Sequence, residues 1–298
     1  MLNAVKTKSI HELPIYQKII VGVLAFISGV IIFTIFPPSA ADWRATFGPV
    51  SSMFLHPYSI NTFNYPPWTV LLLYPIHYFS MNMGVAIIAS LNLFVIGLLV
   101  IKRKGDGLAL FLTLTSYPLL ALIANGSLEW IPALGFIFQN GWGLPLLMVK
   151  PQSGILAALA WFMAAKNKAL FFIPAVLTIL LSFVIWGNWP AAMLASIQFM
   201  NNAKIGPSMV NVSPWPWLIP VGLGLLFYII KYKPASSEIL GAVATFCLVP
   251  YFVPHSLIIP FALLSVSHRR LSILFWVLLW IYPVLTHWAV FMQILGFR

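Results

Sequence analysis

The chain has very few charged residues and almost no acidic ones. Asp, Glu, Lys and Arg make up 7% of its 298 residues, and only five of these are acidic against sixteen basic. A soluble domain of ordinary composition has about 25% charged residues. Because 61% of the residues are hydrophobic, most of the surface must face lipid. A soluble globular fold is therefore excluded.

Motifs for metal and nucleotide binding are also missing. The sequence has no Asp-x-Asp pair, no glycine-rich phosphate loop and no group of His, Cys and carboxylates at metal-ligand spacing. The single cysteine, Cys247, lies in an apolar run, so it forms no intrachain disulfide and is expected to pack in the interior. We therefore expect no metal and no other cofactor. Any phosphate must then be bound by Lys, Arg, His or helix ends.

Most of the charge that is present is positive, with a net charge of +11. The basic residues lie in short groups between hydrophobic runs, where they act as topology signals and contact anionic membrane lipids. No long basic surface interleaved with aromatic residues is present, so nucleic acid is not an expected partner. Four basic groups are expected on the cytoplasmic side: Lys102-Arg103-Lys104, Lys166/Lys168, Lys231/Lys233 and His268-Arg269-Arg270.

Uncharged runs recur along the whole chain, and each reaches the length of about 18 apolar residues that suggests a membrane-spanning helix. These runs are residues 19–36, 81–101, 130–149, 169–203, 205–230 and 271–297. They predict an all-α, polytopic protein of roughly ten helices, integral to the cell membrane. With no internal repeat and no soluble appendage, residues 1–298 are interpreted as a single transmembrane domain. The run 19–36 is expected to be an uncleaved first helix that follows a cytoplasmic N-terminus.

The direction of each helix follows from placing the basic groups inside. The first helix then runs outward, and residues 37–64 form an external loop that contains Asp42. The run 81–101 returns to the cytoplasm, which leaves residues 67–79 as a half-height or in-plane helix. If residues 67–79 span the membrane instead, Lys102–Lys104 lies outside, and the sequence leaves this alternative open.

Residues 130–150 are predicted to form a re-entrant helix pair. A single inward span would put Lys150 in the cytoplasm and Lys166 outside, against the distribution of charge. A break at Gln139-Asn140-Gly141 removes the conflict, because two helices of about ten residues, each about 15 Å long, can dip into the membrane and return. Polar backbone at such a turn is tolerated where protein or a wet cavity surrounds it. Lys150 is then on the same side as Asp42.

The remaining runs complete the expected topology. Residues 107–124 run outward and bring 125–129 to the external face, and residues 169–187 run outward again. The stretch 188–214, rich in Trp, Pro and Asn, is expected to be an external loop with an interfacial aromatic belt. The last helices are expected at residues 216–230, 239–253, 256–266 and 271–297, with His255 at an external turn.

Asp42 is the main candidate for chemistry, because it is the only carboxylate in the first external loop. Partial burial at the membrane boundary raises the pKa of a carboxyl group and suits it to act as a general base. The alternative is a solvated loop charge that nearby Arg44 neutralises.

Lys150 is the main candidate for binding an anion. Apolar residues flank it on both sides, and a lysine near lipid is costly unless it reaches the interface or has an anionic partner. A phosphate is such a partner, since lysine binds phosphate as a point charge. Two weaker candidates lie on the same face: Glu129, which is otherwise a cap for the helix that starts at Trp130, and His255, which is otherwise a turn or packing residue.

An ordered set of residues resembles the GT-C superfamily of membrane glycosyltransferases. The set comprises Asp42, Pro57-Tyr58, Phe63-Asn64-Tyr65-Pro66-Pro67-Trp68, Asn125-Gly126 and Lys150-Pro151. The branch it is most similar to is that of the polyprenyl-phosphate-mannose-dependent mannosyltransferases. The resemblance covers residues 19–165, and residues 166–298 are similar in hydropathy only. One departure is the turn Asn125-Gly126-Ser127, where the family has a Gly-Gln-like pair.

The resemblance implies a GT-C-like fold and transfer of a hexose, such as mannose, from a polyprenyl-phosphate sugar to an extracytoplasmic lipid or glycan acceptor, with inversion and without metal. The implied roles are Asp42 as catalytic base, with Lys150, His255 and Arg44 at the donor phosphate. The implied substrate-binding residues are Tyr65, Glu129, Asn125 and Gln152. Two alternatives from other classes stay open: a transporter or lipid flippase without catalytic activity, and a non-catalytic membrane subunit.

Overall fold

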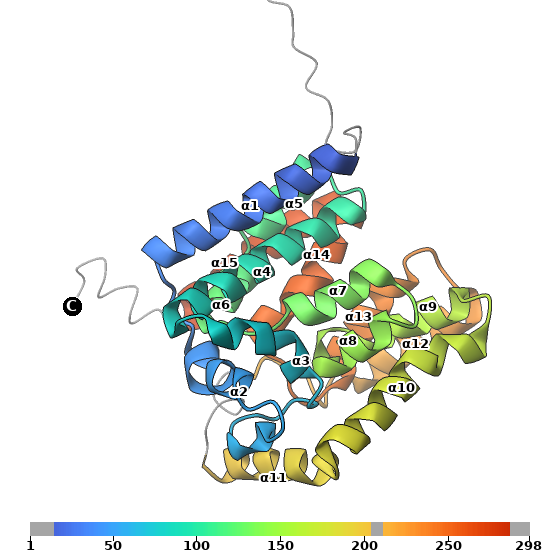
Figure 1. Cartoon of the computed structure of the whole chain (residues 1–298). Helices are drawn as coiled ribbons and strands as arrows, with labels where there is room; N and C mark the ends of the chain where they lie inside the picture. The colour runs from blue at the N-terminus through green and yellow to red at the C-terminus, as the bar shows by residue number, and fades with distance from the viewer. Residues whose placement is uncertain (1–14, 204–210, 287–298) are drawn as a thin grey trace, which may run out of the picture.

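The computed structural model describes residues 15–203 and 211–286, and over these ranges the protein is helical, without a β-strand (Figure 1). The α-helices are α1 (Ile15–Ile35), α2 (Gly48–Ser51), α3 (Thr69–Leu73), α4 (Met81–Lys102), α5 (Gly107–Leu114), α6 (Tyr117–Asn125), α7 (Trp130–Phe138), α8 (Gly143–Val149), α9 (Ala158–Ala164), α10 (Lys168–Trp186), α11 (Trp189–Asn202), α12 (Ile219–Tyr232), α13 (Ser237–Leu248), α14 (Ile258–Ser267) and α15 (Arg269–Thr286). The all-α prediction is confirmed for these ranges. The helices outnumber the roughly ten predicted because breaks divide several of the apolar runs.

Two helices of the described ranges, α4 and α10, are long and apolar enough to cross a membrane. The pair α5 and α6 adds a third span if it is counted as one helix with a 48° bend. These helices have different surroundings. In the apolar 18-residue stretch of each helix, 67% is buried in α4 and 22% in α10. Exposed leucines and isoleucines also run along α1. We conclude that α4 is a core helix, whereas α1 and α10 present apolar surface of the kind that faces lipid.

The predicted break in the run 130–150 is present, and it makes α7 and α8 a tight hairpin (Figure 1). Gln139 ends α7 in the left-handed conformation, with φ +53°. The two arms cross backbone to backbone, because a Cβ added at Gly143 would lie 2.6 Å from the carbonyl oxygen of Gly135. The hairpin therefore returns the chain to its starting level, so that its first and last residues lie together.

The segment that carries Asp42 is anchored on the end of α6. The Ala40 amide donates to the Ala124 carbonyl at 2.7 Å. Gly126, with φ +67°, has no room for a side chain, because a Cβ there would lie 2.8 Å from the Cβ of Ala40. After Asp42 the chain continues as a short π-helix, η2 (Trp43–Phe47). This close approach sets Asp42 beside the turn that leads from α6 to α7.

The expected external loop at residues 188–214 is wrong in part, because α11 occupies Trp189–Asn202. Pro190 lies in the first turn of this helix, where proline is tolerated, and the Ala, Met and Leu that follow are strong helix formers. Residues 204–210, and with them part of the expected run 205–230, lie outside the described ranges, as do residues 287–298 of the expected last helix. The short helix expected at residues 67–79 is present as α3 and the 3-10 helix η4 (Tyr74–Tyr78).

The basic groups gather at one end of the molecule. Arg103, at the end of α4, donates to Glu238 at the start of α13 at 2.5 Å and to the Phe136 carbonyl near the tip of the α7–α8 hairpin at 2.7 Å. The Trp161 indole of α9 also donates to Glu238, at 2.8 Å. These contacts bring the ends of four helices, and the lysines that follow or precede them, to the same level.

Candidate functional site

A fully buried ion pair lies where the two arms of the hairpin meet. Glu129 directly precedes α7 and Lys150 directly follows α8, and the Lys150 ammonium pairs with Oε1 of Glu129. The side chain of Lys150 is 2% exposed and that of Glu129 is 0% exposed. Lys150 is therefore not a lysine that extends to the membrane interface, which was the alternative to an anionic partner. Glu129 is the N-cap residue of α7, but its side chain makes no capping hydrogen bond to the helix.

His255 completes a group of three ionisable side chains. It lies in the 3-10 helix η8 (Pro254–Leu257), and its Nε2 is 3.2 Å from Nζ of Lys150 and 3.6 Å from Oε1 of Glu129. Burial, and next the Lys150 ammonium, lower the pKa of His255 to about 4, against the opposing effect of Glu129. His255 is therefore neutral at physiological pH, and its Nε2 can accept a hydrogen bond from Lys150.

Two serines supply the remaining contacts of the ion pair. The Lys150 ammonium donates to Oγ of Ser127 at 3.0 Å, and the Ser256 hydroxyl donates to Oε1 of Glu129 at 2.7 Å. Oε2 of Glu129 is buried and has no hydrogen-bond partner in the part of the chain that the structure describes. The carboxylate is thus fully engaged at one oxygen and unsatisfied at the other.

Asn92 holds the turn before α7 in place. Its side-chain amide donates to the Ser127 carbonyl at 2.8 Å, and its side-chain oxygen accepts from the Trp130 amide at 3.0 Å. Asn92 lies near the middle of α4, whereas Arg44, two residues after Asp42, bonds to Asn82 in the first turn of the same helix. The segment that carries Asp42 and the turn that carries Glu129 are therefore both anchored on α4.

Asp42 lies within electrostatic reach of this buried pair. Burial raises the pKa of Asp42 above its ordinary value, Lys150 lowers it, Glu129 raises it and the Ser127 hydroxyl lowers it. Asp42 as a whole is half-buried. Asp42 therefore holds a proton more readily than an exposed carboxylate does, although the nearby Lys150 ammonium opposes this rise in pKa.

Two tyrosines face the same carboxylates. Burial, then Asp42 and Glu129, raise the pKa of Tyr65, and the same three causes raise the pKa of Tyr251. The backbone carbonyl of Tyr65 accepts from the Tyr58 hydroxyl at 2.8 Å, which fixes the loop before α3. Both phenols therefore stay protonated and can donate hydrogen bonds.

The structure therefore brings together five of the eight residues chosen from the sequence: Asp42, Tyr65, Glu129, Lys150 and His255. Among the described residues, no side-chain hydrogen bond or ion pair joins the other three to this group. The exposed Arg44 donates to the Ser39 carbonyl and to Asn82, at 3.0 and 2.9 Å, and among the described residues it forms no ion pair with Asp42. The Asn125 side chain bonds to the Ala121 carbonyl at 2.9 Å. Gln152 is half-buried and has no side-chain hydrogen bond to another described residue.

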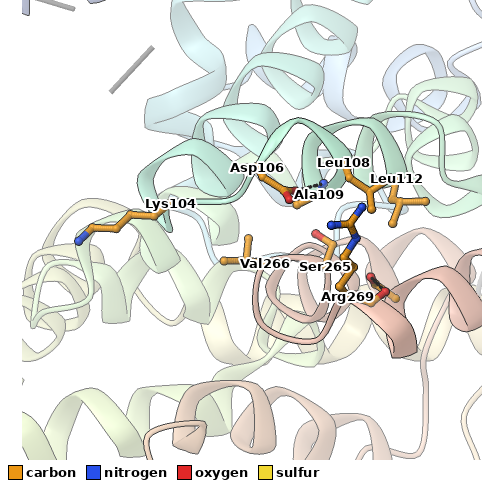
Figure 2. Close-up of a pocket in the computed structure, with 9 residues that line it drawn as sticks. Lys104, Asp106, Leu108, Ala109, Leu112, Ser265, Val266 and Arg269 are labelled. Carbon is orange, nitrogen blue, oxygen red and sulfur yellow. Dashed lines mark hydrogen bonds between the residues drawn. The ribbon is translucent and has the colours of Figure 1, made fainter. Parts of the chain in front are cut away.

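A small cavity of about 150 Å³ lies apart from this site, at the basic end of the molecule (Figure 2). Asp106 lines it, but its carboxylate already accepts from the Ala109 amide at 2.8 Å and caps α5. The hydroxyls of Ser265 and Ser272 are likewise bonded within the protein, and Lys104 points away from the other lining residues (Figure 2). The carboxylate of Asp106 and the two serine hydroxyls are thus already hydrogen-bonded within the protein. In the described ranges, no group of three His, Cys, Asp or Glu has the arrangement of a metal site.

Comparison of the chain with protein-family models, with curated proteins and with solved structures finds no match. The resemblance to GT-C glycosyltransferases therefore rests on the ordered motif residues alone. What the cluster around Lys150 does must be inferred from its own geometry and chemistry.

Proposed function

We propose that this protein is a membrane glycosyltransferase that moves a hexose from a polyprenyl-phosphate sugar to a lipid or glycan acceptor on the extracytoplasmic side. One observation carries the proposal. Asp42, Lys150 and His255, which lie far apart in the sequence, belong to one group with the buried Lys150 at its centre. A base, a cation and a neutral imidazole at one place are the parts that such a transfer needs.

Asp42 has the role of general base. It accepts the proton of the acceptor hydroxyl, whose oxygen attacks the anomeric carbon and forms the new glycosidic bond. The bond between that carbon and the phosphate oxygen breaks, and its electron pair stays on the phosphate. One negative charge thus disappears at Asp42 while one appears on the polyprenyl phosphate. The anomeric configuration inverts because attack and departure occur on opposite faces of the sugar.

Lys150 and His255 have the role of stabilising the phosphate. A buried lysine is a preorganised positive charge, and its effect on a developing anion is larger in a water-poor site than in water. His255, being neutral, donates a hydrogen bond from one ring nitrogen without adding charge. Tyr65 and Tyr251 present phenol groups beside Asp42 and Glu129 and would bind hydroxyls of the sugar or the acceptor.

The arrangement of charge supports an extracytoplasmic site. The basic groups near Arg103 and Glu238 lie at the hairpin tip, whereas Glu129 and Lys150 lie at its open end. If the basic end faces the cytoplasm, as positively charged ends usually do, Asp42 is on the opposite side. The apolar surfaces of α1 and α10 would then face the lipid through which a polyprenyl chain approaches.

The test is transfer by the purified protein in lipid nanodiscs. We expect labelled mannose or another hexose to move from a polyprenyl-phosphate sugar to a member of a panel of lipid and glycan acceptors. The hairpin of α7 and α8 also resembles the half-helices of transporters, so the same donor is offered in sealed vesicles. Movement of intact donor across the bilayer without transfer to any acceptor would replace this proposal with a flippase.

A further inference from the structure

The Lys150 ammonium at the centre of the site is already paired with an anion, the Glu129 carboxylate. Both side chains are buried. A phosphate that binds Lys150 must therefore either share the ammonium with Glu129 or displace it. Because the hydrogen bonds of Asn92 fix the backbone on both sides of Glu129, the carboxylate can turn but cannot leave the site.

We infer that Glu129 is an internal counter-ion which the donor phosphate replaces at Lys150, and that its fixed negative charge makes the site favour a phosphodiester over a phosphomonoester. The inference rests on the proposed function, because it assumes that the anion bound by Lys150 is the phosphate of a lipid-linked sugar. It assigns Glu129 a role in specificity and product release in place of direct binding of substrate.

The geometry of Glu129 suits an exchange of partners. All its contacts are at Oε1, which receives Lys150 and the Ser256 hydroxyl, while the buried Oε2 has no partner among the described residues. A buried polar atom without a hydrogen bond costs free energy. When Lys150 moves to a phosphate, Glu129 therefore loses one partner but gains freedom to turn Oε2 toward a new donor. The phenols of Tyr65 and Tyr251 are close enough for Glu129 to affect their pKa.

The charge of the ligand changes during the reaction. A polyprenyl-phosphate sugar is a phosphodiester with one negative charge, whereas the polyprenyl phosphate left after transfer is a monoester with a charge of about −1.5 to −2 at pH 7. Coulomb repulsion from Glu129 grows in proportion to that charge. The fixed carboxylate thus opposes the product more than the donor, and it promotes release of the polyprenyl phosphate.

The test compares binding of two lipids, a polyprenyl-phosphate mannose and the corresponding polyprenyl phosphate, by the full-length protein in nanodiscs at pH 8. For Glu129→Gln we expect the phosphodiester to bind about tenfold more tightly and the monoester about a hundredfold more tightly. The ratio of the two dissociation constants should therefore change by about tenfold, and the polyprenyl phosphate should become a stronger inhibitor of transfer.

Glu238→Gln is the matched control. Glu238 is also largely buried and ion-paired, with Arg103 at 2.5 Å, but it lies at the other end of the hairpin. We expect this variant to lower thermal stability and to leave the ratio of the two lipid affinities unchanged. An equal change of the ratio in both variants would show a general effect of lost ion pairs and would overturn the inference.

A second pair of variants covers the case in which Glu129→Gln does not fold, since it leaves Lys150 buried without a counter-ion. In the Lys150→Gln background, adding Glu129→Gln should restore part of the lipid binding, and more of it for the monoester. Absence of this rescue overturns the inference. If the unmodified protein binds neither lipid, the proposed function itself fails. If it binds both lipids and Glu129→Gln keeps the original ratio, only the role of Glu129 fails.

Discussion

The Trp43 indole lies so close to Gly84 of α4 that a Cβ added at Gly84 would be 2.6 Å from Cζ2 of Trp43. Trp43 directly follows Asp42, and its ring is buried against the first turns of α4. The position of the proposed base thus depends on a glycine about forty residues further along the chain. Any side chain at this position must move the indole and, with it, Asp42.

The first prediction concerns this contact. Gly84→Ala should lower the rate of transfer at least tenfold while donor binding changes little, because it displaces Asp42 and not Lys150. Loss of precise placement of a reacting group costs about this much or more. Gly97→Ala is the control in the same helix, since a Cβ there meets its nearest atom at 3.8 Å. Equal rates for both variants and the unmodified protein would show that Asp42 is not positioned through Trp43.

The second prediction is a shift in the pH dependence of transfer. A base must be deprotonated, so activity is present above the pKa of Asp42 and is lost as the pH falls through it. Lys150 lowers this pKa and Glu129 raises it. The acid limb of the pH–rate profile should therefore move to higher pH in Lys150→Gln and to lower pH in Glu129→Gln. Shifts in the same direction in both variants would contradict this assignment of the base.

The third prediction separates the charge of Lys150 from its size. Lys150→Ala and Lys150→Gln should both weaken binding of the polyprenyl-phosphate sugar and slow transfer, because neither has a charge to offset the phosphate. Lys150→Arg should recover part of the loss, since its charge remains although its placement differs. Titration of the donor against the three variants gives the result. Unchanged affinity in all three would remove Lys150 from the phosphate site.

The third prediction has a control for folding, because removal of Lys150 should also reduce stability. Breaking a buried ion pair by removing one partner costs about 3–5 kcal/mol, because the other charge is left uncompensated. Lys150→Gln/Glu129→Gln should be more stable than Lys150→Gln, as measured by thermal unfolding in nanodiscs. The stability measurement therefore distinguishes poor donor binding from poor folding in this series.

The fourth prediction is the topology of α10. We expect position 166, before this helix, to lie in the cytoplasm and position 201, at the end of α11, to lie outside. Both positions are exposed, so single cysteines introduced there, with Cys247 replaced, can be labelled with a membrane-impermeant thiol reagent. Labelling of position 166 from outside would reverse the proposed orientation of the site.

Much of the site could be predicted from the sequence because the sequence has so few charged residues. The break between α7 and α8 followed from the need to keep Lys166 with the other basic groups, and it predicted that Lys150 returns to the side of Asp42. Arg44 bonds to Ser39 and Asn82 and does not pair with Asp42, because it follows Asp42 by two residues within helical backbone, where side chains two apart do not face each other. Asn125 was predicted to bind substrate, but its side-chain amide donates to the Ala121 carbonyl within the same helix. Its position in the sequence did not indicate this partner.

Ser127, Ser256 and Tyr251 were missed, since serines and tyrosines are common in membrane proteins and carry no spacing signal. Asn92 did carry a signal. An amide in the middle of a long apolar helix must find hydrogen-bond partners, and its partners turned out to be the backbone on both sides of Glu129. The identity of those partners depended on packing between helices, which the sequence pattern does not specify.

The central claim is that Asp42 is the general base of a glycosyl transfer. The fifth prediction tests it most directly, by comparing donor binding and transfer in Asp42→Asn. Loss of a general base lowers a rate by about 10²–10⁴-fold, and the amide keeps the shape of the side chain. We predict that Asp42→Asn binds the polyprenyl-phosphate sugar as the unmodified protein does but transfers it at least a hundredfold more slowly. Asp106→Asn, at the cap of α5, should transfer normally. Transfer by Asp42→Asn within a few-fold of the unmodified rate would contradict the account.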